Sequence, residues 1–181
     1  FVIIKWNIGA PTIDSFTINP SPIIAGEKAT LTWTSTNSLF GSINNGVNAV
    51  NVPNGSIDVY PPDDRTYTLT VTGYGGLTDT ATVSIVVYIP PVIIVSTNKI
   101  EMMLGSVANL SWVTTGDADN IVWVSGGISN SNLISNSNVS PTTTTSYAAY
   151  VSGLGGTSSV SSVSVVVYYF PTVEVDYPTN I

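Results

Sequence analysis

The 181-residue sequence predicts an all-β chain of two tandem β-sandwiches, and three observations support this fold class. Apolar residues alternate with small polar residues at a period of two. Three motifs of the first half return in the second half. Clusters of glycine, proline and asparagine separate the alternating segments, and none of these segments has the 3.6-residue period of an amphipathic helix. Alternation bounded by turn residues is typical of strands with one buried face, so each half should pack two antiparallel sheets face to face.

The alternation is clearest in three segments of the first half, residues 29–33, 67–71 and 80–85. Successive side chains of a strand point to opposite faces of its sheet. The threonines on either side of Leu31 should therefore face solvent, while Leu31 and Trp33 face the core. Tyr67 falls on the same buried phase, as do Trp112 and Tyr147 in the second half.

Internal repeats favour two domains, because the recurring motifs keep a nearly constant spacing. The first motif returns after 79 residues and the other two after 80, which implies the insertion or deletion of one residue between them. The motifs and their copies are Gly26–Trp33 and Gly105–Trp112, Pro61–Tyr67 and Pro141–Tyr147, and Gly73–Gly76 and Gly153–Gly156.

Pro11, Pro91 and Pro171 mark the repeat boundaries, since they stand at equal intervals of 80 residues in similar sequence. The boundaries imply that the chain is a segment of a longer array. The predicted parts are the last strand of a preceding repeat or a linker at 1–10, repeat 1 at 11–90, repeat 2 at 91–170, and the first strand of a following repeat or a linker at 171–181.

Composition argues against several classes of function. The chain has 4 Lys+Arg against 11 Asp+Glu and a net charge of −7, whereas nucleic-acid binding needs a basic surface. It has no cysteine and no histidine, which removes disulfides, thiolate nucleophiles, imidazole bases and the usual zinc ligands. Pro90 and Pro91 interrupt the longest apolar run, so no membrane insertion is expected.

These motifs resemble the immunoglobulin-like repeats of bacterial and phage proteins, over residues 11–170. The shared features are a proline-rich start, a Gly-x-x-x-x-Leu-Ser/Thr-Trp strand, a turn and strand that reach Tyr67 or Tyr147, and a Gly-Gly hairpin. The resemblance implies tandem immunoglobulin-like β-sandwiches at an extracellular, cell-surface or virion-surface location. It also implies that both tyrosines are corner tyrosines, whose hydroxyls bond to the backbone in such domains.

One pair of core positions differs between the repeats. Two residues after the tyrosine, Leu69 of repeat 1 is replaced by Ala149 of repeat 2, and Trp123 stands where the 80-residue register places Ile43. Because cores are close-packed, we expect the lost leucine and the gained indole to offset each other in volume.

No catalytic, cofactor-binding or metal site is predicted, so the chain is not expected to be an enzyme. Ser96-Thr-Asn-Lys99 matches a Ser-x-x-Lys pattern, but that chemistry needs a helix to place the lysine beside the serine. Asp117-Ala-Asp-Asn120 is followed by apolar residues where a calcium loop requires an oxygen ligand and a glycine. Asp63-Asp64 precedes Arg65 in a predicted turn.

Exposed aromatic residues remain as candidates for a binding face. Tyr74 lies in a Gly-Gly motif that lacks the helix of a phosphate loop and is interpreted as a hairpin turn. Tyr150 falls on the outward phase. Each has a non-aromatic counterpart in the other repeat, so a shared glycan platform is not expected. The N-glycosylation pattern is matched at Asn54, Asn109 and Asn138, and its use depends on the source organism.

The sequence therefore predicts non-catalytic structural or spacer modules of an extracellular fibre, a phage virion or a cell-surface protein. Their partners would be neighbouring immunoglobulin-like modules or other copies of the same chain. Two alternatives stay open. One is an adhesion module that binds a cell-surface glycan or receptor. The other is a filament subunit that assembles by β-strand donation through residues 1–10 and 171–181.

Overall fold

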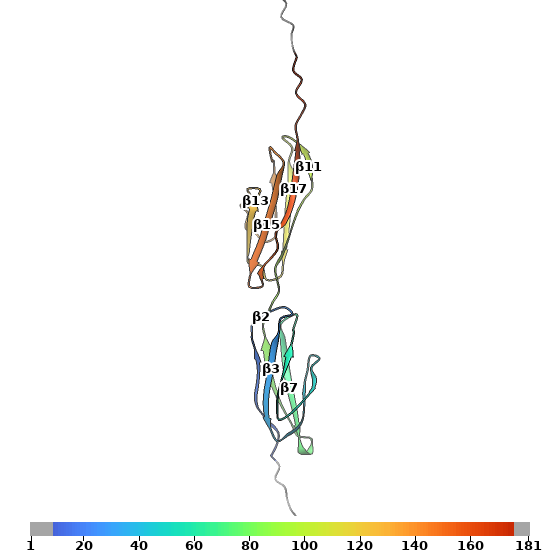
Figure 1. The fold of residues 1–181 in the computed structure, drawn as a ribbon, viewed down its shortest axis with the longest axis vertical. Coiled ribbons are helices and arrows are strands. Elements are labelled where there is room, and N and C mark those ends of the chain that lie inside the picture. The colour runs from blue at the N-terminus through green and yellow to red at the C-terminus, as the bar shows by residue number, and fades with distance from the viewer. Residues whose placement is uncertain (1–8, 176–181) are drawn as a thin grey trace, which may run out of the picture. The chain divides into compact units, whose positions relative to one another are not determined.

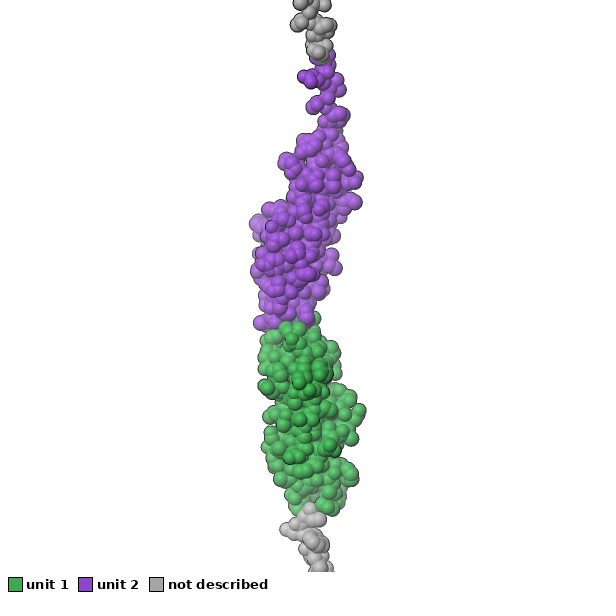
Figure 2. Space-filling view, viewed as in Figure 1, with its two compact units in different colours: residues 1–89 green, residues 90–181 purple. Residues whose placement is uncertain are grey.

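The computed structural model describes residues 9–175 and confirms the all-β fold class (Figure 1). Over these residues every regular element is a β-strand, except for a short 3₁₀ turn at Tyr74–Gly76. None of them is a helix long and apolar enough to cross a membrane. The chain divides into two compact units, residues 1–89 and 90–181 (Figure 2). Each unit has a hydrophobic core of its own.

Unit 1 consists of a three-stranded sheet in the order β1-β3-β6 and a four-stranded sheet in the order β5-β4-β7-β8, both antiparallel. A short additional pair, β2 and β9, runs parallel. The bounds are β1 Thr12–Asn19, β2 Ile23–Ile24, β3 Ala29–Thr36, β4 Ser38–Ile43, β5 Asn48–Val50, β6 Asn54–Val59, β7 Arg65–Gly73, β8 Thr78–Ile85 and β9 Val87–Tyr88.

Unit 2 repeats this arrangement, with one sheet in the order β10-β12-β14 and the other in the order β11-β17-β15-β13. Strand β11 runs parallel to β17, as β2 does to β9. The units differ at one edge, because β5 pairs with β4 in unit 1 whereas residues 126–134 of unit 2 contain no strand. The bounds are β10 Val92–Thr97, β11 Glu101–Met103, β12 Ala108–Thr115, β13 Asn120–Ser125, β14 Ser135–Val139, β15 Thr145–Gly153, β16 Gly156–Thr157 and β17 Ser161–Tyr168.

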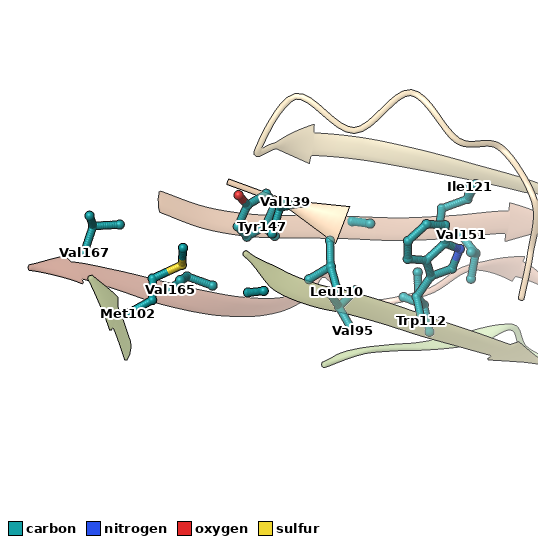
Figure 3. Packing of buried hydrophobic residues seen from close by; sticks show 13 residues of the cluster. Val95, Met102, Leu110, Trp112, Ile121, Val139, Tyr147, Val151, Val165 and Val167 are labelled. Carbon is teal, nitrogen blue, oxygen red and sulfur yellow. The ribbon is translucent and has the colours of Figure 1, made fainter. Parts of the chain in front are cut away.

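The cores confirm the predicted buried phase. Strand β3 turns its threonines outward and buries Leu31 and Trp33. The exposed fraction is 2% for Trp33, Trp112 and Tyr67, and 3% for Tyr147. Figure 3 shows the core of unit 2, where Leu110 lies between Trp112 and Tyr147. Period-two alternation was therefore sufficient to find the interior side chains.

The central tryptophan of each unit also holds the segment that connects the two sheets. Trp33 Nε1 donates a hydrogen bond to the Asn51 carbonyl at 2.9 Å, and Trp112 Nε1 donates to the Asn132 carbonyl at 2.7 Å. A buried indole N–H needs such an acceptor. The same side chain thus fills the core and fixes the path of a loop.

The register confirms the predicted exchange of core residues. Ile43 lies directly opposite Leu69 in unit 1, and Trp123 lies opposite Ala149 in unit 2. Trp123 also packs edge to face against Trp112, with ring centroids 5.0 Å apart and an interplanar angle of 82°. The second indole thus stands across from a small residue, where unit 1 pairs two medium-sized side chains.

This pairing predicts a non-additive double mutant. Ala149→Leu should overpack unit 2 against Trp123 and cost about 1–3 kcal/mol. Trp123→Ile alone should lose ring contacts and leave a void. The double variant restores the pair found in unit 1, so urea unfolding should show a loss smaller than the sum of the single losses by about 0.5–3 kcal/mol. Additive losses would mean that the two positions do not share one space.

The terminal segments were predicted to be strands of neighbouring repeats or linkers. Residues 171–175 form no strand, and the exposed fractions of Val173 and Val175 are 85% and 61%. They are therefore not part of the core of unit 2. Residues 1–8 and 176–181 lie outside the described part of the chain, so a strand at either terminus stays a prediction.

Candidate functional site

The Ser-x-x-Lys pattern does not form a catalytic pair. Ser96 Oγ lies 2.9 Å from Ser111 Oγ, and Lys99 Nζ donates to the Val107 carbonyl at 2.8 Å. Ser96 belongs to β10 and Lys99 follows the end of that strand. Without a helix, the backbone does not place the amine beside the hydroxyl.

The carboxylates of Asp63 and Asp64 are used in local structure. Asp63 Oδ1 lies 2.8 Å from Arg65 Nη2, and Asp64 Oδ1 accepts a hydrogen bond from Val87 N at 2.6 Å. Asp119 N donates to the Ser152 carbonyl ahead of β13. Across residues 9–175, no three His, Cys, Asp or Glu side chains gather closely enough to hold a metal ion.

The glycine motifs form β-hairpin turns, as predicted. One joins β7 to β8 and the other joins β15 to β16. Gly75, Gly76 and Gly156 have φ values of 75°, 76° and 104°, in the left-handed region that glycine enters at no steric cost. Tyr74, at the first turn, is 54% exposed. These loops therefore serve chain reversal.

The three asparagines of the glycosylation pattern differ in exposure. Asn54 and Asn138 are exposed, whereas Asn109 is half-buried. Asn109 Nδ2 donates a hydrogen bond to Asn138 Oδ1 at 3.1 Å. A glycan on Asn109 would replace one of the two hydrogens of this amide nitrogen and leave a single N–H for the contact with Asn138.

A pocket recurs beside the buried tyrosine of each unit. In unit 2 it has a volume of about 520 Å³ and lies between the loop after β13, strand β14, the turn before β15 and Tyr147. In unit 1 the volume is about 290 Å³, and Tyr67 lines the wall. Corresponding residues of the repeats line both pockets, namely Tyr67 and Tyr147, Pro61 and Pro141, and Val59 and Val139.

The tyrosine hydroxyls correct one expectation. The resemblance implied that they bond to the backbone, yet neither the Tyr67 nor the Tyr147 hydroxyl has a hydrogen-bond partner among residues 9–175. No side-chain oxygen or nitrogen that is fully shut off from solvent lacks a hydrogen-bond partner over the same residues, so both hydroxyl oxygens are open to solvent. Both tyrosines line a pocket, where water can take the place of the expected backbone acceptor.

Burial raises the pKa of both hydroxyls above the ordinary tyrosine value of 10.0. For Tyr67 the nearby Arg65 acts in the opposite direction, but burial is the larger influence. Both groups therefore stay protonated at neutral pH, and each can donate one hydrogen bond into its pocket.

The two pockets differ in charge. The pocket of unit 1 is lined by Asp58 and Arg65, and Asp58 Oδ2 lies 3.2 Å from Lys28 Nζ. Hydrogen bonds from Thr30 and then Lys28 hold the pKa of Asp58 below its ordinary value of 3.8. None of the residues that line the pocket of unit 2 carries a charge at neutral pH.

The loop after β13 forms a fixed wall of the unit 2 pocket. Gly126 has a φ of 93°, and a Cβ there would collide with the ring of Tyr147. Further along, Trp123 Nε1 donates to the Asn130 carbonyl at 3.1 Å, and Trp112 binds the carbonyl of Asn132. Sequence reasoning missed this pocket. Its only sequence signal is the Gly-Gly pair followed by an Asn- and Ser-rich stretch between two predicted strands.

Comparison with known proteins identifies the fold. No protein-family model matches the chain, and no curated protein matches it. Among solved structures it is similar to the mouse nectin-like molecule 4 ectodomain, with a TM-score of 0.54 and 13% identity over 92% of this chain and 66% of that one. It is also similar to domains D1-D2 of Rst (TM-score 0.54, 13% identity, 90% of this chain and 100% of that one). The fold is immunoglobulin-like.

A third similar structure is the four N-terminal immunoglobulin domains of Dscam1 isoform 9.44, with a TM-score of 0.53 and 15% identity over 92% of this chain and 48% of that one. The immunoglobulin-like chain spans about two thirds of the nectin-like ectodomain and about half of the Dscam1 fragment. At these identities the likeness concerns the fold alone.

The acidic turns predict that stability is independent of calcium. Thermal unfolding with calcium and with a chelator should give coinciding curves. A bound ion at a hundredfold excess over its dissociation constant would instead add about 2.7 kcal/mol. A calcium-induced rise that disappears in Asp117→Asn would contradict this expectation.

The raised pKa values of Tyr67 and Tyr147 predict a loss of stability at alkaline pH. As the pH rises past 10.0, tyrosines of the unfolded chain deprotonate before Tyr67 and Tyr147 of the folded chain. The unfolded state then binds fewer protons, so the free energy of unfolding falls. The contribution of these two tyrosines to the free energy of unfolding is fully present at pH values below the tyrosine pKa of the unfolded chain. It is lost as the pH rises through their pKa values in the folded chain.

Urea unfolding midpoints between pH 8 and pH 11 measure this effect. The double variant Tyr67→Phe with Tyr147→Phe should show a shallower alkaline decline than the parent chain. Equal declines would mean that the pKa values of these two hydroxyls are the same in the folded and the unfolded chain.

Proposed function

We propose that this chain is a pair of non-catalytic spacer modules of an extracellular fibre, a virion or a cell-surface protein. The observation that carries the proposal is that the two units repeat one strand order and that each has a complete core of its own. Modules of this kind can be added in series without disturbing their neighbours, because each buries its own apolar face.

The segment after β17 supports an array. In the 80-residue register, Pro171 corresponds to Pro91, and Val173 and Val175 correspond to Ile93 and Val95. Ile93 and Val95 are only 4% and 6% exposed, within the core of unit 2. We infer that Val173 and Val175 take the same buried places in the sandwich of a following module.

The surface chemistry suits a spacer better than an enzyme. Ser96, Lys99, Asp63 and Asp64 of the candidate catalytic and metal-binding patterns use their side chains in contacts of strands and turns. The proline pair at Pro90-Pro91 lies at the division between the units, and prolines stiffen a junction by fixing their own φ and restricting the preceding residue.

Adhesion is the alternative that a specific observation favours. One similar structure is the Down Syndrome Cell Adhesion Molecule, whose name gives its role (TM-score 0.53, 14% identity, 90% of this chain and 25% of that one). The pockets beside Tyr67 and Tyr147 would supply a place for a ligand. Strand donation stays the third candidate, with residues 171–181 pairing to another copy of the chain.

The array predicts opposite effects for two matched substitutions. Val173→Asp should change the urea unfolding free energy of unit 2 by less than about 0.5 kcal/mol, because this side chain is exposed. Ile93→Asp, at the corresponding position, should cost at least about 3 kcal/mol, because it buries an unpaired charge.

Sedimentation of the same chain separates the versions of the proposal. A monomer supports a spacer whose segment pairs only with its own following module. Concentration-dependent association that Val173→Asp abolishes would support strand donation. If Val173→Asp destabilised unit 2 as strongly as Ile93→Asp, residues 171–175 would pack into the core of unit 2, and both versions would be wrong.

A further inference from the structure

The pocket of unit 2 has the size of a small-ligand site. Its volume of about 520 Å³ falls within the usual range of roughly 300–1,000 Å³ for such sites. The equivalent pocket of unit 1, at about 290 Å³, lies at the lower limit. The difference follows from local structure, because unit 1 continues into β5 where unit 2 has the irregular loop 126–134.

The Tyr147 hydroxyl is an unused donor at the inner wall of this pocket. The residue is 3% exposed, and its hydroxyl has no partner among residues 9–175. Only solvent or a ligand in the pocket can satisfy this hydroxyl.

The remaining walls offer neutral hydroxyl groups. Within the described chain, the side-chain hydroxyls of Ser137, Ser140, Thr142 and Thr143 make no hydrogen bond to protein. Three apolar side chains stand among them, Ile128, Val139 and Pro141. Hydroxyl groups mixed with small apolar surfaces match a pyranose ring, which presents both O–H groups and C–H faces.

No charged residue lines this pocket, which favours a neutral ligand over a charged one. A phosphate or an acidic sugar would lose hydration here without gaining a compensating cation. A neutral saccharide needs no such cation.

The pocket is also held in shape before any ligand binds. The indoles of Trp112 and Trp123 hold the carbonyls of Asn132 and Asn130. Asn130 Nδ2 donates to Ser135 Oγ at 3.1 Å, and Asn130 Oδ1 accepts from Asn132 N at 2.9 Å. A wall fixed by four hydrogen bonds reduces the ordering cost of binding.

We propose that the Tyr147 pocket binds one neutral hexopyranose unit of a glycan, with the tyrosine hydroxyl donating to a sugar oxygen. This site goes beyond the spacer role, which stands whether or not the pocket binds. The smaller pocket of unit 1, with Asp58 and Arg65 in its lining, should not bind the same ligand and serves as an internal control.

The test is an amide NMR titration of the whole chain with methyl glycosides of glucose, galactose, mannose and N-acetylglucosamine, and with glucuronate as a charged control. At least one neutral glycoside should shift the amides of residues 126–130 and 137–147 in a saturable way. Tyr147→Phe should weaken binding about three- to tenfold, the loss of one neutral hydrogen bond, while Tyr67→Phe should leave it unchanged.

A second variant protects the test against a folding defect. Ser137→Leu should fill the pocket and abolish the shifts, with thermal unfolding of both variants used to verify that unit 2 stays folded. A glycan ending in the same sugar should bind at least as tightly as the free glycoside if the natural ligand is a chain end. The proposal is wrong if no neutral glycoside shifts these amides, if glucuronate binds equally well, or if Tyr147→Phe leaves the affinity unchanged in a folded chain.

Discussion

The hydrogen bond from a buried indole to a loop carbonyl is the constraint on which the rest of each unit depends. Trp33 and Trp112 each stand on the central strand of a three-stranded sheet, and each holds a carbonyl of the segment that crosses to the other sheet. The ring cannot leave the core without leaving its N–H unpaired. Core packing and loop path are therefore fixed by one side chain, in a chain with no disulfide to do it.

The differences between the units follow from a second indole. Trp123 faces the small Ala149, packs against Trp112 and holds the Asn130 carbonyl. In unit 1 the same edge is closed by backbone pairing between β4 and β5. Unit 2 thus replaces a strand with a loop held by side chains, and the wider pocket beside Tyr147 accompanies this replacement. A change at one core pair is linked in this way to the shape of the surface.

The sequence was sufficient for the strands, the buried phase and the glycine hairpins, because these depend on alternation and turn chemistry that are local in the chain. The partner of Trp123 was also predictable, because the repeat supplies the register. The absence of a backbone partner for the tyrosine hydroxyls could not be predicted in this way. The surroundings of the Tyr147 hydroxyl depend on where the loop after β13 passes, and hydrogen bonds from Trp112 and Trp123 hold that loop. The sequence shows the donors but not which carbonyl each one finds.

The short parallel pairs have a mechanical consequence. In unit 1, Ile23 N donates to the Val86 carbonyl at 3.1 Å and Ala25 N to the Tyr88 carbonyl at 2.9 Å. Because β2 and β9 run parallel, a pull on the N-terminal end of β2 and the C-terminal end of β9 would act along the strands and load their hydrogen bonds together. An antiparallel hairpin pulled at its open end instead loses its bonds one after another. Strands β11 and β17 share this geometry, so the same pull in unit 2 would also load the hydrogen bonds of its parallel pair together.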